Sequence, residues 1–259
     1  MKRVKNKGLL KSLLVPILGV VAALALILVT ILSVVAYKNT EKQIEDDGLV
    51  ANELVSQNVS SFISKAYALS RELAQNPSIL TMDTNVQTPI LQKCVEDNDY
   101  LELLYIQNEK GMQTGRSSGE LADRSERWWF QQMLKDTQPF VSNSYYSVNT
   151  GMPCASVFYP MYKDGKFIGV FGADIKLDSM VDLVTKMSDE DKDKEVFIID
   201  GEGTIVAHPN SQYIEELYNY ETYKKTVSVK DSNGNVQKDA DGNIVTKKKN
   251  LSVRTHSKK

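Results

Sequence analysis

The distribution of apolar positions divides the chain into a membrane-length segment, a long amphipathic helix and a series of short strands. Residues 12–37 contain no charged side chain and are flanked by Lys11 and Lys38. At about 1.5 Å per residue, roughly 20 apolar residues are enough to cross the hydrocarbon core of a bilayer. This segment therefore predicts a transmembrane helix, and it excludes a cytoplasmic enzyme.

The charges around that segment predict its orientation. Five basic residues and no acidic residue precede position 12. Basic residues are retained on the cytoplasmic side of a membrane, so residues 1–11 are predicted to be cytoplasmic and the chain from residue 38 onward extracellular or periplasmic. The alternative is a cleaved signal peptide, with Val34 and Ala36 at a small-residue cleavage site. Because the apolar run is about twice as long as in such peptides, we predict an uncleaved anchor in the cell membrane.

Beyond the anchor, apolar residues recur at intervals of three and four, which is the pattern of an amphipathic helix. The pattern ends at Asn76-Pro77, since the residue before a proline is disfavoured in a helix. Residues 38–76 are thus predicted to form a long stalk helix, whose apolar stripe packs on its own domain, forms the seam of a homodimer, or does both. The stripe consists of Gly48, Ala51, Val55, Val59, Phe62, Ala66, Leu69 and Leu73.

Residues 77–188 combine helical and strand patterns, which indicates an α+β lobe with an antiparallel sheet. Lys163-Asp164-Gly165 is a hairpin signal between the last two strands. Helices are predicted over residues 86–97, 123–136 and 177–187, and strands over residues 100–107, 112–116, 140–147, 155–162 and 166–175.

Residues 189–259 repeat part of this pattern after a charged linker. The strand, polar turn and glycine of residues 105–111 recur at 197–203, an offset of 92 residues. A helix is predicted over 212–224 and a strand over 226–230, after which the pattern of sheet strands stops. We therefore expect two similar lobes of which the second is incomplete, so that the chain is a fragment or a truncated product.

Composition and charge exclude one class of partner. The chain is 42% hydrophobic and 25% charged, as in ordinary folded proteins. Residues 38–246 carry 20 basic and 33 acidic side chains, whereas the last thirteen residues carry six basic and none acidic. An acidic body does not suit nucleic acid, so no nucleic-acid partner is predicted. The basic tail from Lys247 is predicted to be a frayed, solvated end; the alternative is contact with anionic lipid.

The sequence lacks the motifs of the common enzyme classes. It has only two histidines and no G-x-S-x-G, H-E-x-x-H or strand-linked G-x-G-x-x-G motif. We therefore predict that the chain is not an enzyme and that it holds no cofactor or metal. Cys94 and Cys154 are either one disulfide or two buried thiols, and the sequence leaves both open.

One group of side chains suits the binding of a small charged molecule. Arg127, Trp129 and Phe130 are predicted on one helix, Tyr145 on a strand, and Asp174 near the end of the last strand of the lobe. Arginine offers a planar pair of donors to a carboxylate, and the indole N–H adds another. An aspartate with tyrosine faces attracts an ammonium group. The set complements a zwitterion or an amine; the alternative is an aromatic core with a structural ion pair between Arg127 and Asp174.

This layout resembles the double Cache (dCache_1) sensor ectodomain of bacterial methyl-accepting chemotaxis proteins and related transmembrane receptors. The resemblance covers about residues 10–225 and rests on the anchor, the long helix, the Arg127-x-Trp129-Phe130 motif, Tyr145 and the strand Gly169–Asp174. It implies two PAS-like lobes on a long N-terminal helix, with the ligand in the membrane-distal lobe. In the amino-acid-binding subgroup, the arginine and tryptophan of the motif hold the carboxylate, while the tyrosine and aspartate hold the amino group.

Two positions depart from the pattern of that subgroup. Ala122 stands where the subgroup has a tyrosine five residues before its arginine, and Phe130 replaces a second tyrosine. Amines, purines and organic acids therefore stay open as ligands beside amino acids. The resemblance implies the sensing part of a chemoreceptor. The alternatives are the ectodomain of a sensor kinase or cyclase, and a membrane-anchored structural module without a small ligand.

Overall fold

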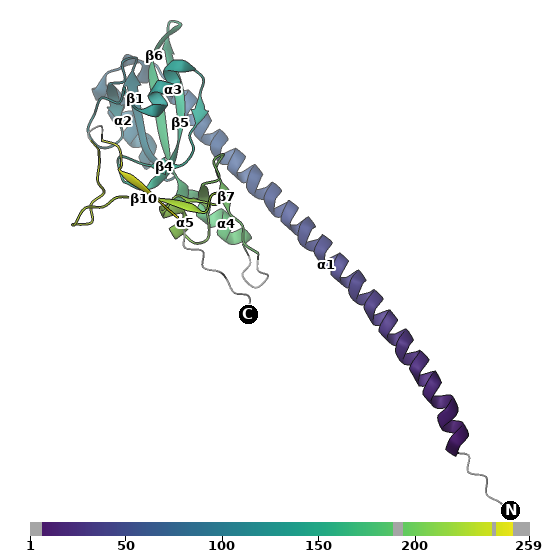
Figure 1. Cartoon of the computed structure of the whole chain (residues 1–259). Coiled ribbons are helices and arrows are strands. Elements are labelled where there is room, and N and C mark those ends of the chain that lie inside the picture. The colour runs from purple at the N-terminus through teal and green to yellow at the C-terminus, as the bar shows by residue number, and fades with distance from the viewer. Residues whose placement is uncertain (1–6, 189–193, 240–241, 251–259) are drawn as a thin grey trace, which may run out of the picture. The chain divides into compact units, whose positions relative to one another are not determined.

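The computed structural model describes residues 7–188, 194–239 and 242–250. The chain divides into two compact units, Met1–Leu54 and Val55–Lys259. Figure 1 shows the order of the elements along the chain. Most of the predicted linker, residues 189–193, lies outside the described residues. The arrangement as a whole confirms the predicted fold class, a long apolar helix followed by antiparallel sheets.

The first element is a single helix, α1 (Lys7–Ala74), which runs without a break through the predicted anchor and stalk. The helix ends at Ala74, two residues before the predicted end at Asn76. Within the described residues, the segment Leu13–Ala74 is long and apolar enough to cross a membrane by length and composition. Large apolar side chains from Leu13 to Val35 are exposed around the helix, which is the surface that lipid would cover.

The second unit is built on an antiparallel sheet with the strand order β2-β1-β6-β5-β3, and β4 also pairs with β5. The β5–β6 turn has Asp164 and Gly165 at φ values of 51° and 74°, as a two-residue hairpin turn requires. The strands are β1 (Leu101–Asn108), β2 (Gln113–Arg116), β3 (Phe140–Val141), β4 (Tyr145–Tyr146), β5 (Pro153–Lys163) and β6 (Lys166–Lys176).

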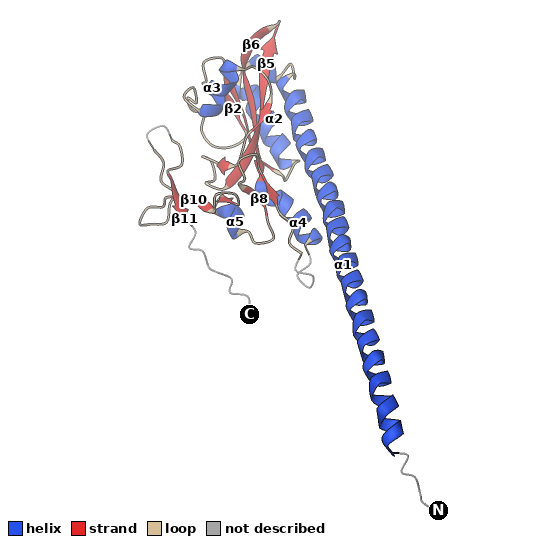
Figure 2. Cartoon of the chain, turned by 45° about the vertical axis from the view of Figure 1, so that its right-hand side comes forward, coloured by secondary structure: helices blue, strands red, loops and turns tan. Residues whose placement is uncertain are grey.

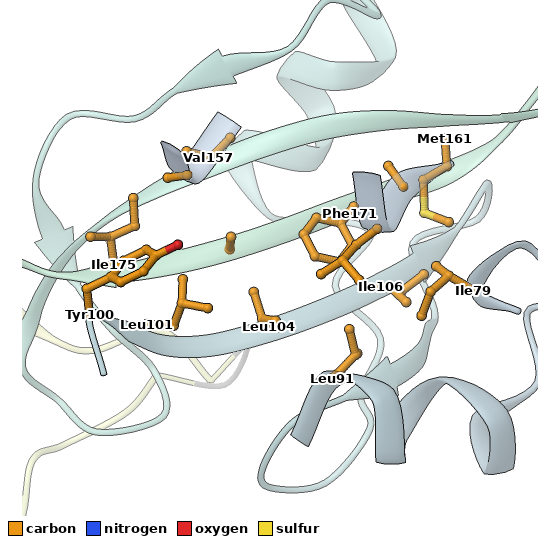
Figure 3. Close-up of a cluster of buried hydrophobic side chains, with 14 residues drawn as sticks. Ile79, Leu91, Tyr100, Leu101, Leu104, Ile106, Val157, Met161, Phe171 and Ile175 are labelled. Atoms are coloured by element: carbon orange, nitrogen blue, oxygen red, sulfur yellow. The ribbon is translucent and has the colours of Figure 1, made fainter. Parts of the chain in front are cut away.

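Each face of this sheet carries its own core. One face packs on α2 (Thr84–Glu96), the short helix η1 (Ile79–Thr81) and the C-terminal part of α1. Leu104, Ile106 and Phe171 lie on that face (Figure 3). The other face packs on α3 (Trp128–Lys135), and Figure 2 shows α2 and α3 on opposite sides of the sheet. Because neighbouring residues of a strand point to opposite faces, Leu103 and Tyr105 of β1 belong to the second core.

The helix predicted over residues 123–136 is shorter than expected. α3 begins at Trp128, and Arg127 is its N-cap with an extended backbone, so the prediction that Arg127 lies within the helix is wrong. Asp123 does not cap the helix, because its Oδ1 accepts a hydrogen bond from the Ser125 amide at 2.8 Å and forms a turn. The strand predicted over 140–147 likewise separates into β3 and β4, where the Ser144 amide donates to Asp200 at 2.9 Å.

The predicted internal repeat has the same turn geometry in both copies. Asn108 accepts hydrogen bonds through its side chain from the amides two and four residues later, and Asp200 does the same. Gly111 and Gly203 close the two turns with φ values of 86° and 79°. The second copy forms a hairpin of β7 (Ile198–Ile199) and β8 (Ile205–Ala207), which follows η2 (Leu177–Met180) and α4 (Val181–Met187).

Two predictions for the last part of the chain are wrong. The helix expected over 212–224 is only α5 (Gln212–Glu215), because the backbone turns at Leu217 with φ 41° and then forms β9 (Tyr218–Asn219). The start of the basic tail is also ordered. Lys247, Lys248 and Lys249 belong to β11 (Thr246–Asn250), which pairs with β10 (Lys224–Ser228).

Candidate functional site

The candidate site is centred on Asp174, near the end of β6. Its partners across the sheet are Leu103 on β1 and Ser156 on β5, so the three side chains share the face that packs on α3. Oδ1 of Asp174 accepts hydrogen bonds from Ser156 Oγ at 2.6 Å and from the hydroxyls of Tyr105 and Tyr145 at 3.1 and 3.3 Å. Within the described residues no hydrogen bond reaches Oδ2, which leaves this oxygen for a ligand.

Burial determines the protonation of this cluster. Asp174 is 4% exposed, and its removal from water raises its pKa from 3.8 to about 6, against the opposing effect of the Ser156 hydrogen bond. The same burial raises the pKa of Tyr105 and of Tyr145 well above 10, so both phenols are donors. A buried carboxylate costs several kcal/mol unless it is paired, which favours a cationic ligand group beside Asp174.

Arg127 reaches the same cavity from the N-cap position of α3. Its side chain is 8% exposed, and its Nη1 is buried without a hydrogen-bond partner in the part of the chain that the structure describes. Among those residues no ion pair joins Arg127 to Asp174, so the structural alternative weighed for these two residues does not occur. A buried guanidinium nitrogen without an acceptor is costly, and an anionic ligand group would satisfy it.

Aromatic side chains form the apolar wall. Trp129 stacks on Phe158 with ring centroids 4.9 Å apart and lies 5.7 Å from the ring of Tyr105. Phe130 does not line the cavity; it is 1% exposed and packs in the core of this face. Arg127, Trp129, Tyr145 and Asp174 thus line one cavity, whereas the fifth predicted residue, Phe130, lies in the hydrophobic core next to it.

The cavity has a volume of about 20 Å³, which holds about one or two water molecules, so a bound amino acid requires the walls to move apart. Larger hollows lie elsewhere, including one of about 440 Å³ beside Glu102 and Ile214. None of the buried, unpartnered polar atoms found in the described residues lines that hollow. The lining residues of the candidate site are Leu103, Tyr105, Gln113, Arg116, Arg124, Arg127, Trp129, Tyr145, Val148 and Asp174.

Sequence reasoning missed several members of this site, above all Tyr105 and Arg116. Both are set by strand register, since Tyr105 pairs with Arg116 on one side and with Gly172 on the other. A Cβ at position 172 would overlap the Tyr105 ring. Gly172, two residues before Asp174, could have indicated Tyr105 from the sequence, because a glycine within a strand is typical of a place where a large side chain packs against the backbone.

The described residues show neither a group of metal-ligand side chains nor a disulfide. They contain no group of three or more histidine, cysteine, aspartate or glutamate side chains placed to hold a metal ion. Cys94 on α2 and Cys154 on β5 are free thiols, and the second is buried. The disulfide that the sequence left open is therefore not formed.

The site contacts the second half of the unit through β4. Tyr145 donates into the Asp174 cluster, whereas the hydroxyl of its neighbour Tyr146 donates to the carbonyls of Glu215 and Thr226 at 2.6 and 2.8 Å. Lys238 also donates to the carbonyl of Val148, a residue of the cavity wall, at 2.7 Å. Hydrogen bonds therefore join the strand and loop beside the cavity to Glu215, Thr226 and Lys238.

Comparison with known families agrees with this architecture. Residues 35–252 match the Cache domain. The chain belongs to the Cache-domain family. This Cache domain is 24% identical over 242 residues to the methyl-accepting chemotaxis protein PscA of Pseudomonas syringae, a match that covers 87% of this chain and 37% of PscA. The predicted family is therefore confirmed.

Two further similarities are of different weight. The sensory domain of the Campylobacter jejuni chemoreceptor Tlp3, solved with isoleucine bound, is 26% identical with a TM-score of 0.52; the match covers 69% of this Cache domain and 74% of that structure. A citrate (Re)-synthase of Syntrophus aciditrophicus is 28% identical over 129 residues, which is 45% of this chain and 20% of the synthase. The chain thus spans only part of both curated relatives, 20% of the synthase and 37% of PscA.

Proposed function

We propose that this Cache domain is the extracellular or periplasmic sensing part of a membrane chemoreceptor, and that the cavity at Asp174 binds a small amino acid or amine. One observation carries the proposal: Arg127 and Asp174 line one cavity, Arg127 Nη1 is buried without a hydrogen-bond partner, and no ion pair joins the two side chains among the described residues. The chemotaxis protein PscA and the isoleucine-bound domain of Tlp3 support the receptor and the ligand class. The match to the synthase covers too little of that enzyme to favour catalysis.

The proposed roles follow from the chemistry of each group. Arg127 and the Trp129 indole would hold a carboxylate, because both are donors and Nη1 of Arg127 is free. Asp174 would hold an ammonium group through Oδ2, with Tyr145 beside it. The ligand would lie in residues 77–188, the lobe farther from the membrane, and residues 189–259 would form the second lobe. The signalling output, whether chemotaxis, a kinase or a cyclase, is set outside these residues.

A ligand panel tests the proposal directly. The full chain in lipid nanodiscs is heated with amino acids, amines, purines or organic acids, and unfolding is followed by tryptophan fluorescence. A ligand at a hundred times its Kd adds about 2.7 kcal/mol to the folded state, which raises the Tm by several degrees in a chain of this size. We expect hits among compounds that carry an amino group. If only nitrogen-free acids or no compounds raise the Tm, the proposal is wrong.

The membrane arrangement is part of the same proposal. Residues 12–37 would cross the membrane with residues 1–11 inside, and α1 would form the seam of a homodimer through its stripe of small and apolar residues. The charge bias before residue 12 and the apolar part of α1 support this arrangement.

Cysteine labelling tests the orientation in intact cells. Single cysteines are placed at Asn6 and Asn233 in a chain whose Cys94 and Cys154 are serine. An impermeant maleimide should label position 233 and leave position 6 unlabelled until the cells are permeabilised. The reverse pattern in intact cells would show the opposite orientation.

A further inference from the structure

The candidate cavity carries more positive charge than a neutral amino acid can balance. Arg116, Arg124 and Arg127 line it, whereas Asp174 is the single carboxylate among the described lining residues. Within the described part of the chain, none of the three guanidinium groups forms an ion pair with a carboxylate. Arg116 and Arg127 are buried, and Arg124 is half-buried. Because buried charges are ordinarily paired, a surplus of three cations over one anion is a feature that needs a ligand to complete it.

The three arginines lie near enough to influence one another. Burial is the main cause that lowers the pKa of Arg124, and the charges of Arg116 and Arg127 lower it further. Burial also lowers the pKa of Arg116, which the charges of Asp174 and Glu102 partly restore. The protein thus holds like charges together at a cost in free energy, which an incoming anion would remove.

Arg116 is held in place by neutral groups. Its Nη1 donates to Gln113 Oε1 at 3.2 Å, its Nε donates to the carbonyl of Ser118, and its Nη2 approaches Asn149 Oδ1 at 3.4 Å. These acceptors orient the guanidinium but leave its charge uncompensated. Its side chain is 5% exposed, so solvent does not take the place of an anion.

Two residues before Arg124 lies the position where the amino-acid-binding pattern has a tyrosine. That position is Ala122, whose amide donates to Gln113 Oε1, the atom that also holds Arg116. Ala122 itself does not line the cavity, whereas Gln113, Arg116 and Arg124 do. The lining therefore carries two cationic side chains, Arg116 and Arg124, in addition to Arg127.

We propose that the ligand is an amino acid with a negatively charged side chain, whose second carboxylate binds Arg124 and Arg116. The inference rests on the proposed function, in which Arg127 and Asp174 hold the α-carboxylate and the ammonium group. Counting the three arginines and Asp174 of the lining, an acidic amino acid leaves one positive charge on the liganded cavity. A neutral amino acid leaves two positive charges, and a simple amine leaves three.

Matched ligand pairs test the inference on the full chain in nanodiscs. Glutamate is compared with glutamine, and aspartate with asparagine, because each pair differs in charge and hardly in size. We expect at least one acid to bind about tenfold more tightly than its amide, which corresponds to about 1.4 kcal/mol. Arg124→Gln should bring that ratio close to one. The control Arg71→Gln, which removes an exposed arginine of α1, should leave the ratio unchanged.

The outcomes separate this inference from the proposed function. If glutamine, asparagine or isoleucine binds as tightly as the acids, the amino-acid site stands and the second-carboxylate site is wrong. An acid preference that survives in Arg124→Gln and in Arg116→Gln, with the fold checked by circular dichroism, also overturns it. If nitrogen-free diacids bind as well as glutamate, or if no amino acid binds, both proposals fail together.

Discussion

Asp174→Asn is expected to lower the affinity for amino acids and amines by at least about 100-fold while leaving the fold intact. The amide keeps the shape of the carboxylate and still accepts a hydrogen bond from Ser156, but it carries no charge for the ammonium group. Loss of one partner of a buried charge pair costs about 2–5 kcal/mol in binding. The affinities are measured by tryptophan fluorescence, and the control is Asp178→Asn, an exposed aspartate four residues later.

The pH dependence gives this prediction a second readout. Burial raises the pKa of Asp174 to about 6 in the folded state, above its ordinary value of 3.8. The unliganded protein should therefore gain about 1 kcal/mol relative to Asp174→Asn when the pH falls from 7 to 5, because the folded state binds the proton first. Amino-acid affinity should fall over the same range as the carboxylate is neutralised. A pH profile identical to that of Asp174→Asn would show that Asp174 is not the titrating group.

Local sequence signals predicted most of the first lobe. The alternation of apolar residues gave β1 and β6 within about one residue of their observed bounds, and Lys163-Asp164-Gly165 correctly placed the hairpin between β5 and β6. These features depend on neighbouring residues, since a strand has period two and a tight turn needs particular residue types. The long helix was predictable for the same reason, because its apolar positions repeat over many turns.

Elements that depend on distant contacts were not predictable. Residues 212–224 have a helical composition, yet the chain turns at Leu217 so that β9 can pair with β10 and Tyr218 can pack on Tyr213. The Asn219 side chain also donates to the carbonyl of Glu202, seventeen residues earlier. Tertiary contacts of this kind override helix propensity, which is worth less than about 1 kcal/mol per residue.

The candidate site divides in the same way. Arg127, Trp129, Tyr145 and Asp174 could be proposed from the sequence, because the motif and the strand that carry them are visible in it. Tyr105 and Arg116 were missed, and they come to the site only through the pairing of β1 with β6 and with β2. Strand register decides which side chains meet, and a local pattern does not contain it.

Gly172→Ala is expected to disrupt both the fold of this lobe and the site. Gly172 lies opposite Tyr105, and a Cβ there would overlap the ring of that tyrosine. The ring cannot move aside freely, since it is 4% exposed, packs on Trp129 and donates to Asp174. Overpacking of a buried site costs about 1–3 kcal/mol. The Tm should therefore fall by several degrees, and ligand affinity should fall more than about tenfold because a hydroxyl is withdrawn from Asp174.

A matched variant and a double mutant separate this mechanism from a general effect of adding a methyl group. Gly201→Ala meets only Asn143 Oδ1, 3.7 Å from the new Cβ, so it should leave the Tm within about 1 °C, since surface substitutions usually change stability by less than about 0.5 kcal/mol. Tyr105→Leu in the Gly172→Ala background removes the overlapping ring, and it should recover most of the lost stability but none of the affinity. Equal Tm losses in the single and double mutants would mean that the new Cβ strains the backbone of β6. Full recovery of binding in the double mutant would show that the Tyr105 hydroxyl does not support Asp174.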